Sequence, residues 1–191
     1  MMGNNKQFKL IFIASFLASL SYGVMLTLPV YLTKNLNYPV SFSGEVISLG
    51  VIGVLISIIT LPSTLKVFSN KVLSSFGAMV YSLAIICIIT GLQPLLFLAG
   101  FLLGFGWGVI YTMGPIMVSE ASNENNRSKN FSFISAFNML GAGIAPILVK
   151  ISLDVNIDMG TILYLASSIS ILSGLLFIIT RLCPVTIFCT I

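Results

Sequence analysis

Six apolar stretches dominate this sequence, and each is long enough to cross a membrane as a helix. About 20 helical residues span the roughly 30 Å hydrocarbon core of a bilayer. Helices are required because lipid offers no partner to unpaired backbone groups, and the stretches lack the alternation of a membrane β-barrel. We therefore expect an all-α membrane protein in which residues 1–181 form six transmembrane helices and 182–191 form a short tail. The expected spans are 10–32, 42–61, 72–90, 94–118, 131–151 and 161–180.

The composition agrees with a membrane protein and excludes several other classes. Only 7% of the 191 residues are charged, and 57% are hydrophobic. A soluble domain carries about 25% charged residues. The net charge of +4 is spread over short connections without a basic stripe, so we expect the lipid bilayer, and no nucleic acid, as the partner.

The basic residues predict how the helices are oriented. If the six stretches cross alternately, seven of the nine lysines and arginines fall on one side of the membrane. Basic residues are retained in the cytoplasm during insertion, so both termini are expected there, in a multi-pass protein of the cell membrane. The seven are Lys6, Lys9, Lys66, Lys71, Arg127, Lys129 and Arg181, against Lys34 and Lys150 on the other side.

The residues that catalysis in a membrane usually needs are missing or misplaced. The chain has no histidine, and its three cysteines match no metal-binding spacing. Both aspartates, Asp154 and Asp158, fall in a connection outside the membrane. We therefore expect no enzymatic activity, no cofactor and no metal site.

Small residues recur at helix-contact spacing within the apolar stretches. Lipid tails are as apolar as the side chains, so no hydrophobic driving force brings helices together in a membrane. Helices associate there by close packing instead. We therefore expect packing faces in the fourth and fifth spans. They comprise Gly100, Gly104, Gly108, Gly141, Ala145 and Pro146.

A short pattern in the first span returns in the fourth. The segment Tyr22-Gly23-Val24 leads to Thr27 and Pro29, and Trp107-Gly108-Val109 leads to Thr112 and Pro115, 85 or 86 positions later. The first span runs outward and the fourth inward, so the two copies have opposite orientation. Inverted three-helix repeats are typical of secondary transporters. The pattern predicts two inverted three-helix repeats.

Three segments resemble the major facilitator superfamily. Glu120 and Arg127, seven apart after the fourth span, are similar to the acid–arginine pair of the family's loop between helices four and five. The run 141–146, GAGIAP, is similar to its fifth-helix signature, with Ala145 in place of a glycine. The segment 36–44 is similar to the entry into the second helix. The loop between helices two and three departs from the family, with Lys66 where an aspartate and Ser69 where a glycine is usual.

The resemblance implies a fold and a function. Family members have twelve helices in two six-helix halves, with the substrate between them. The chain resembles an N-terminal half, as a fragment, a truncated transporter, or a partner of a second six-helix half or of another copy. It implies secondary active or facilitative transport of a small unknown solute by alternating access. The alternative is a non-transporting membrane protein or transporter remnant acting as a structural partner.

Polar and aromatic residues at mid-membrane depth are the candidates for a substrate cavity. The resemblance places Tyr22, Trp107 and Tyr111 toward the cavity, since helices one and four line it in the family. Asn138 in the fifth span is a further candidate. Packing against neighbouring helices, or hydrogen bonding between helices, is the other explanation for all four.

The acidic residues suggest two further roles. Glu45 lies near the outer end of the second span, where it is either a coupling residue or a solvated acid at a helix start. Glu120 and Arg127 are expected to pair and organise the cytoplasmic loop 119–130. No span carries a buried basic residue, so we expect a neutral, zwitterionic or apolar solute, or a countercharge from another chain.

Overall fold

The computed structural model describes residues 3–180, and these form an all-helical bundle with six helical segments of membrane-spanning length. The predicted fold class is therefore confirmed. The first span is divided into α1 and a short α2, and each later span is one helix. The bounds are α1 Gly3–Met25, α2 Leu28–Lys34, α3 Val40–Thr64, α4 Asn70–Ile89, α5 Gln93–Ala121, α6 Glu124–Asp154 and α7 Met159–Ile179.

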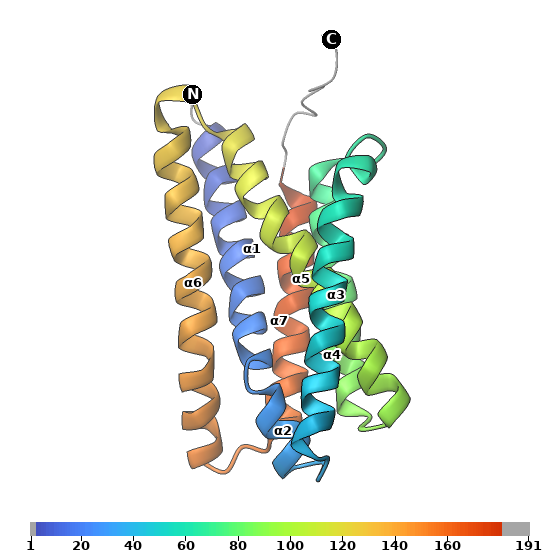
Figure 1. The fold of residues 1–191 in the computed structure, drawn as a ribbon. Helices are drawn as coiled ribbons and strands as arrows, with labels where there is room; N and C mark the ends of the chain where they lie inside the picture. The colour runs from blue at the N-terminus through green and yellow to red at the C-terminus, as the bar shows by residue number, and fades with distance from the viewer. Residues whose placement is uncertain (1–2, 181–191) are drawn as a thin grey trace.

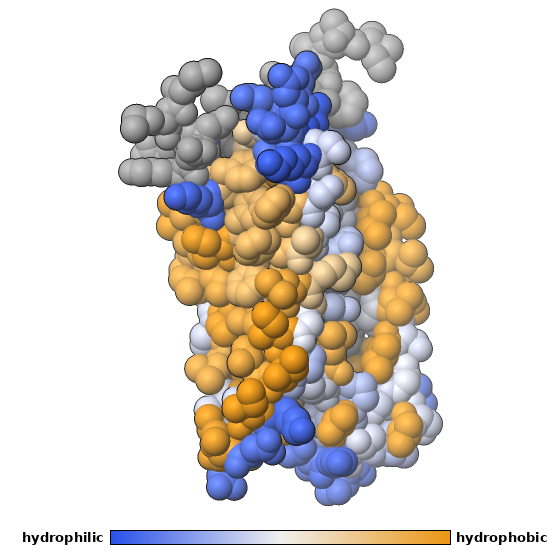
Figure 2. Space-filling view, turned by 90° about the vertical axis from the view of Figure 1, so that its left-hand side faces the viewer, coloured by the Kyte–Doolittle hydropathy of each residue, from blue (hydrophilic) through white to orange (hydrophobic). Residues whose placement is uncertain are grey.

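The helices run up and down between two hydrophilic ends. One end holds the start of α1, the α3–α4 turn and the α5–α6 turn, and the other holds α2, the α4–α5 turn and the α6–α7 connection (Figure 1). An apolar band lies between these ends on the face that Figure 2 shows. Lys66, Lys71 and Arg127 therefore lie at one end of the bundle, and Lys34 and Lys150 at the other. Arg181 and the tail 182–191 are outside the described residues.

The first predicted span is interrupted near its C-terminal end. Helix α1 ends at Met25, and α2 begins at Leu28, with Pro29 in its first turn. Proline lacks an N–H, and its ring clashes with the carbonyl four residues earlier, which here is Met25. Two tight turns fill the gap, from Leu26 N to Gly23 O at 3.2 Å and from Thr27 N to Val24 O at 3.1 Å. The chain thus changes direction inside the bundle.

The hydrophilic loop expected at 119–130 is almost entirely helical, which corrects that prediction. Helix α5 continues to Ala121 and α6 begins at Glu124, so only residues 122–123 connect them. Asn123 has extended dihedral angles and ends the connection. Hydropathy marks where a helix leaves the lipid, whereas a helix in water continues wherever its backbone bonds are satisfied. The polar residues therefore extend both helices beyond their apolar spans.

Helix α5 lies at the centre of one half of the bundle, packed against α3 and α4, and α1 packs against α6 and α7. Helices α4 and α7 join the two halves through a buried run of serines, the serine seam. Ser82 and Ser167 share a hydrogen bond of 2.7 Å. Ser170 donates to the carbonyl of Ala78 on α4 at 3.0 Å. Ser173, on the same helix α7, donates to the carbonyl of Ala14 on α1 at 2.8 Å.

Glycines bring the backbones of α3 and α5 into close contact, and we call this contact the glycine seam. A Cβ atom added to Gly104 would overlap the carbonyl oxygen of Gly50, and one on Gly108 would overlap the hydroxyl of Ser57. Gly100 meets the backbone of Val46 in the same way. Such close approach is possible only without side chains, and it maximises van der Waals contact in lipid.

Candidate functional site

A pocket of about 240 Å³ lies where the α1–α2 break meets α3, α4 and α5. Its walls are mainly apolar. Leu26 and Val51 line it and are 52% and 57% exposed, so the pocket opens on the surface of the bundle. The fifteen lining residues include no acidic or basic residue.

Two local features of the sequence create this space. The interruption before Pro29 turns the chain away from the axis of α1, so that Met25 and Leu28 line the pocket beside it. On the facing side, Gly50 and Gly104 line the pocket and contribute no side chain. The residues that allow α3 and α5 to touch therefore also leave room beside their contact.

Two aromatic side chains from α1 and α5 stack in the pocket wall. The rings of Tyr22 and Trp107 have centroids 3.8 Å apart and planes inclined by 8°. Tyr111, one turn along α5, contacts Trp107 at 5.6 Å with a tilt of 38°. The Tyr22–Trp107 stack joins the two copies of the repeated sequence pattern.

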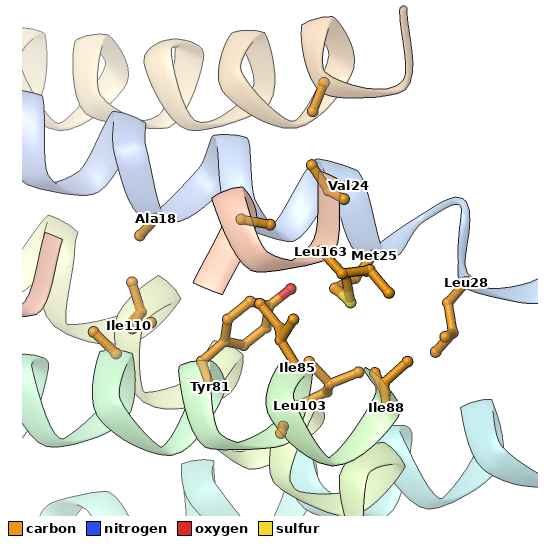
Figure 3. Packing of buried hydrophobic residues seen from close by; sticks show 14 of the residues in the cluster. Ala18, Val24, Met25, Leu28, Tyr81, Ile85, Ile88, Leu103, Ile110 and Leu163 are labelled. Atoms are coloured by element: carbon orange, nitrogen blue, oxygen red, sulfur yellow. The ribbon is translucent and has the colours of Figure 1, made fainter. Parts of the chain in front are cut away.

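The third aromatic lining residue, Tyr81, reaches the pocket from α4. Its side chain is 1% exposed and packs in the main hydrophobic core, and Figure 3 shows its hydroxyl pointing from α4 toward α1. This hydroxyl has no hydrogen-bond partner within the described residues. Buried hydroxyls are normally paired, so an unpaired one beside a pocket is a candidate for contact with a ligand.

The family comparison explains this architecture. The model of the Major Facilitator Superfamily matches residues 11–186 of the 191. The chain belongs to this family. No curated protein matched the chain in a second comparison. Members of the superfamily are membrane transporters, and six membrane-length helices correspond to one half of their fold.

The structure separates the four residues expected in the cavity of this superfamily member. Tyr22 and Trp107 line the pocket. Tyr111 is 42% exposed and does not line it. Asn138 on α6 is 5% exposed, also lies outside the lining, and its side-chain oxygen has no partner among the described residues. Sequence reasoning missed Tyr81, for which the only available signal was a tyrosine in the middle of a span.

The acidic candidates differ from each other in their surroundings. Glu45, in the second turn of α3, is exposed. Glu120 accepts a hydrogen bond of 2.5 Å from the Asn70 amide, which ties α5 to the start of α4. No ion pair joins Glu120 to Arg127 in the described part of the chain, and the expected role of the two residues in organising this connection stays a prediction.

The helix-packing candidates lie at two contacts. Gly100, Gly104 and Gly108 belong to the glycine seam, and Gly141 and Ala145 lie on α6 against α1. Pro146 is inside α6, which continues through it. Within residues 3–180 no group of three or more cysteine or acidic side chains is arranged to hold a metal ion.

Proposed function

We propose that this chain is one six-helix half of a secondary or facilitative transporter, which moves a small solute by alternating access. Six further helices, from the same polypeptide, from another chain or from another copy of this one, supply the second half. The observation that carries the proposal is the Tyr22–Trp107 stack in the wall of an open pocket. It joins helices that have corresponding places in two inverted repeats.

The glycine contacts support such a repeat. Gly23 of α1 packs against Ala145 of α6, and Gly108 of α5 packs against Ser57 of α3. Gly108 follows Gly23 by 85 positions, and Ala145 follows Ser57 by 88. The same shifts relate the backbone contacts of Gly141 with Leu20 and of Gly53 with Phe105. Thus α1 packs on α6 through the positions by which α5 packs on α3.

Two contacts indicate where the axis that relates the two repeats lies. Tyr22 and Trp107 are 85 positions apart and stack, and Ser82 and Ser167 are 85 positions apart and share a hydrogen bond. Equivalent residues of two copies touch only near the axis that relates them. Helices α1 and α5 run in opposite directions (Figure 1), so the axis lies across the helices, as in the inverted repeats of transporters.

The charge distribution supports a cytoplasmic location for both termini in the cell membrane. Within residues 3–180, six basic residues from α1, the α3–α4 turn and the start of α6 share one end of the bundle, against two at the other. A membrane-impermeant maleimide should label Lys34→Cys in intact cells and leave Lys66→Cys and Arg127→Cys unlabelled. The background has serine at the native cysteines. Labelling of position 66 or 127 from outside would contradict the orientation.

Transport is tested with purified chain in proteoliposomes, alone and reconstituted with a candidate second half. The assay follows radiolabelled neutral, zwitterionic and cationic solutes across the membrane. We expect saturable flux above that of protein-free vesicles, lost in Trp107→Ala and kept in Tyr164→Ala, whose side chain is 59% exposed on α7. Absence of flux in every combination would favour the structural-partner alternative.

A further inference from the structure

The chemistry of the pocket indicates what kind of molecule it accepts. We propose that it binds an uncharged, mainly apolar molecule or moiety through one hydrogen-bond acceptor, which the phenol hydroxyls of Tyr22 and Tyr81 recognise. The inference rests on the proposed function, because it names the substrate class of the same site. It stands on the size of the pocket, on the absence of charge in its lining and on its unpaired hydrogen-bond donors.

The volume limits the bound part to a small ring system. An apolar cavity of about 150 Å³ holds benzene. By the same ratio, about 240 Å³ accommodates roughly ten heavy atoms. The glycines in the wall and the exposed rim allow a larger molecule to extend beyond the pocket while one apolar group fills it.

The absence of charge disfavours an ion. A charged group that enters this pocket loses its hydration and meets no countercharge among the lining residues. An organic cation could instead use aromatic faces. However, Tyr22 and Trp107 cover one face of each other at 3.8 Å, which removes the largest such surface.

The polar groups of the lining favour a hydrogen-bond acceptor. Besides backbone groups, these are the hydroxyls of Tyr22 and Tyr81 and the indole N–H of Trp107, and none has a hydrogen-bond partner within residues 3–180. An indole N–H only donates, and both phenols can donate. A carbonyl or ether oxygen would therefore be satisfied at any of the three, whereas a pure donor would find only the phenols.

The two hydroxyls differ in access. The Tyr22 side chain is partly exposed, whereas the Tyr81 hydroxyl is fully covered in this conformation. An acceptor reaches Tyr81 only when a neighbour moves. Met25 lines the same pocket, and its flexible thioether side chain can adapt at low cost. Tyr22 is thus the first contact and Tyr81 the deeper one.

The test uses Trp107, the single tryptophan of the chain, as a reporter inside the pocket. Its fluorescence in purified, detergent-solubilised chain is titrated with 2-adamantanone and with adamantane, which differ in one carbonyl group. We expect the ketone to bind about three- to tenfold more tightly, the range for one net hydrogen bond. Tyr22→Phe and Tyr81→Phe should each reduce this preference, and the double variant should reduce it further than either, leaving only what the Trp107 N–H contributes. Tyr164→Phe, outside the pocket, should leave it unchanged.

Each remaining outcome contradicts the inference. Equal binding of ketone and hydrocarbon, or a preference that the double variant leaves undiminished, excludes recognition by the phenols. Binding of 1-adamantylammonium or adamantane-1-carboxylate as tight as that of the ketone excludes the uncharged class, and so does the absence of binding by every probe. Because this binding needs no transport, flux that fails while ketone binding persists overturns only the proposed function.

Discussion

The glycine seam and the serine seam hold the bundle together in opposite ways. In the glycine seam, α3 and α5 meet backbone to backbone, and Gly104 lies directly on the carbonyl of Gly50. In the serine seam, α4 and α7 keep room for side chains, and Ser82 and Ser167 bond across it at 2.7 Å. The first contact depends on missing volume and the second on hydrogen bonds between side chains.

The comparison teaches that small residues have two distinct uses in a membrane. Removing side chains lets two helices gain dispersion contact along their whole crossing, and this gain is lost if any one side chain forces them apart. Hydroxyls add separate bonds whose loss is local. The pocket lies beside the glycine seam, so the shape of the candidate site depends on the less tolerant of the two contacts.

The largest effect is expected from Gly104→Val. The side chain would occupy the position of the Gly50 carbonyl and separate α3 from α5, at a cost of about 3 kcal/mol or more, above the usual range for overpacking. Unfolding in mixed detergent micelles, followed by circular dichroism, measures it. The matched control is Gly143→Val on α6, where a Cβ meets nothing within 4 Å. If both variants are equally stable, the glycine seam is not a steric contact.

A smaller effect is expected from Ser82→Ala. It removes one bond between α4 and α7 and leaves the Ser167 hydroxyl unpaired. Hydrogen bonds between helices in a membrane average about 0.6 kcal/mol and reach about 1.7 kcal/mol. The double variant with Ser167→Ala should recover part of this loss, because neither hydroxyl is then unpaired. A loss as large as that of Gly104→Val would remove the distinction between the two seams.

Gly174→Ala should change stability by less than about 0.5 kcal/mol. Gly174 lies on α7 in the serine seam, and a new Cβ would be 3.2 Å from the Cβ of Ala78 and 3.4 Å from the Ser75 carbonyl. This slight crowding is offset by the better helix propensity of alanine. The same unfolding assay measures it. A loss above about 2 kcal/mol would lie in the range of an overpacked core. It would show that the serine seam also tolerates no added side-chain volume.

The smallest effect lies outside both seams and concerns pH. Asp158 caps α7 and accepts hydrogen bonds from Thr161 Oγ1 at 2.6 Å and Thr161 N at 2.8 Å. These bonds hold the pKa of its carboxyl below the ordinary value of 3.8. The ionised Asp158 carboxyl therefore contributes fully to the stability of the fold at any pH above that ordinary value. This contribution is lost as the pH falls through the lower pKa of the folded state. Unfolding measured at pH 7 and pH 3 should show a larger drop for the wild type than for Asp158→Asn; equal drops would contradict this.

The sequence was enough to predict six helices of membrane-spanning length and their places along the chain. Apolar length is a local property, and lipid allows only one backbone solution for it. It was not enough to predict helix ends. The break at Met25 could have been inferred from Pro29, but Pro62, Pro115 and Pro146 lie within unbroken helices. Packing against neighbouring helices determines which prolines interrupt a helix. The sequence of one segment does not show which helices will be its neighbours.

The candidate site was only partly predictable. Tyr22 and Trp107 could be found because a repeated pattern distinguishes them from other aromatic residues in the spans. Tyr81 could not, since an apolar segment with one tyrosine has the same appearance whether the hydroxyl faces lipid, core or pocket. The segment 119–130 was expected to be a loop and is almost entirely helical, because its hydrophilic composition does not give the path of the chain. The role of Glu120 and Arg127 there stays a prediction.

The sequence by itself determined that this chain is a helical membrane protein, because the hydrophobicity of each segment depends on that segment alone. Its family was also readable from motifs and their order. Only the tertiary structure decided which small residues touch, at which proline a helix is interrupted, and which aromatic side chains meet around a pocket. Those outcomes depend on distances between residues far apart in the chain, which are set when the helices pack together.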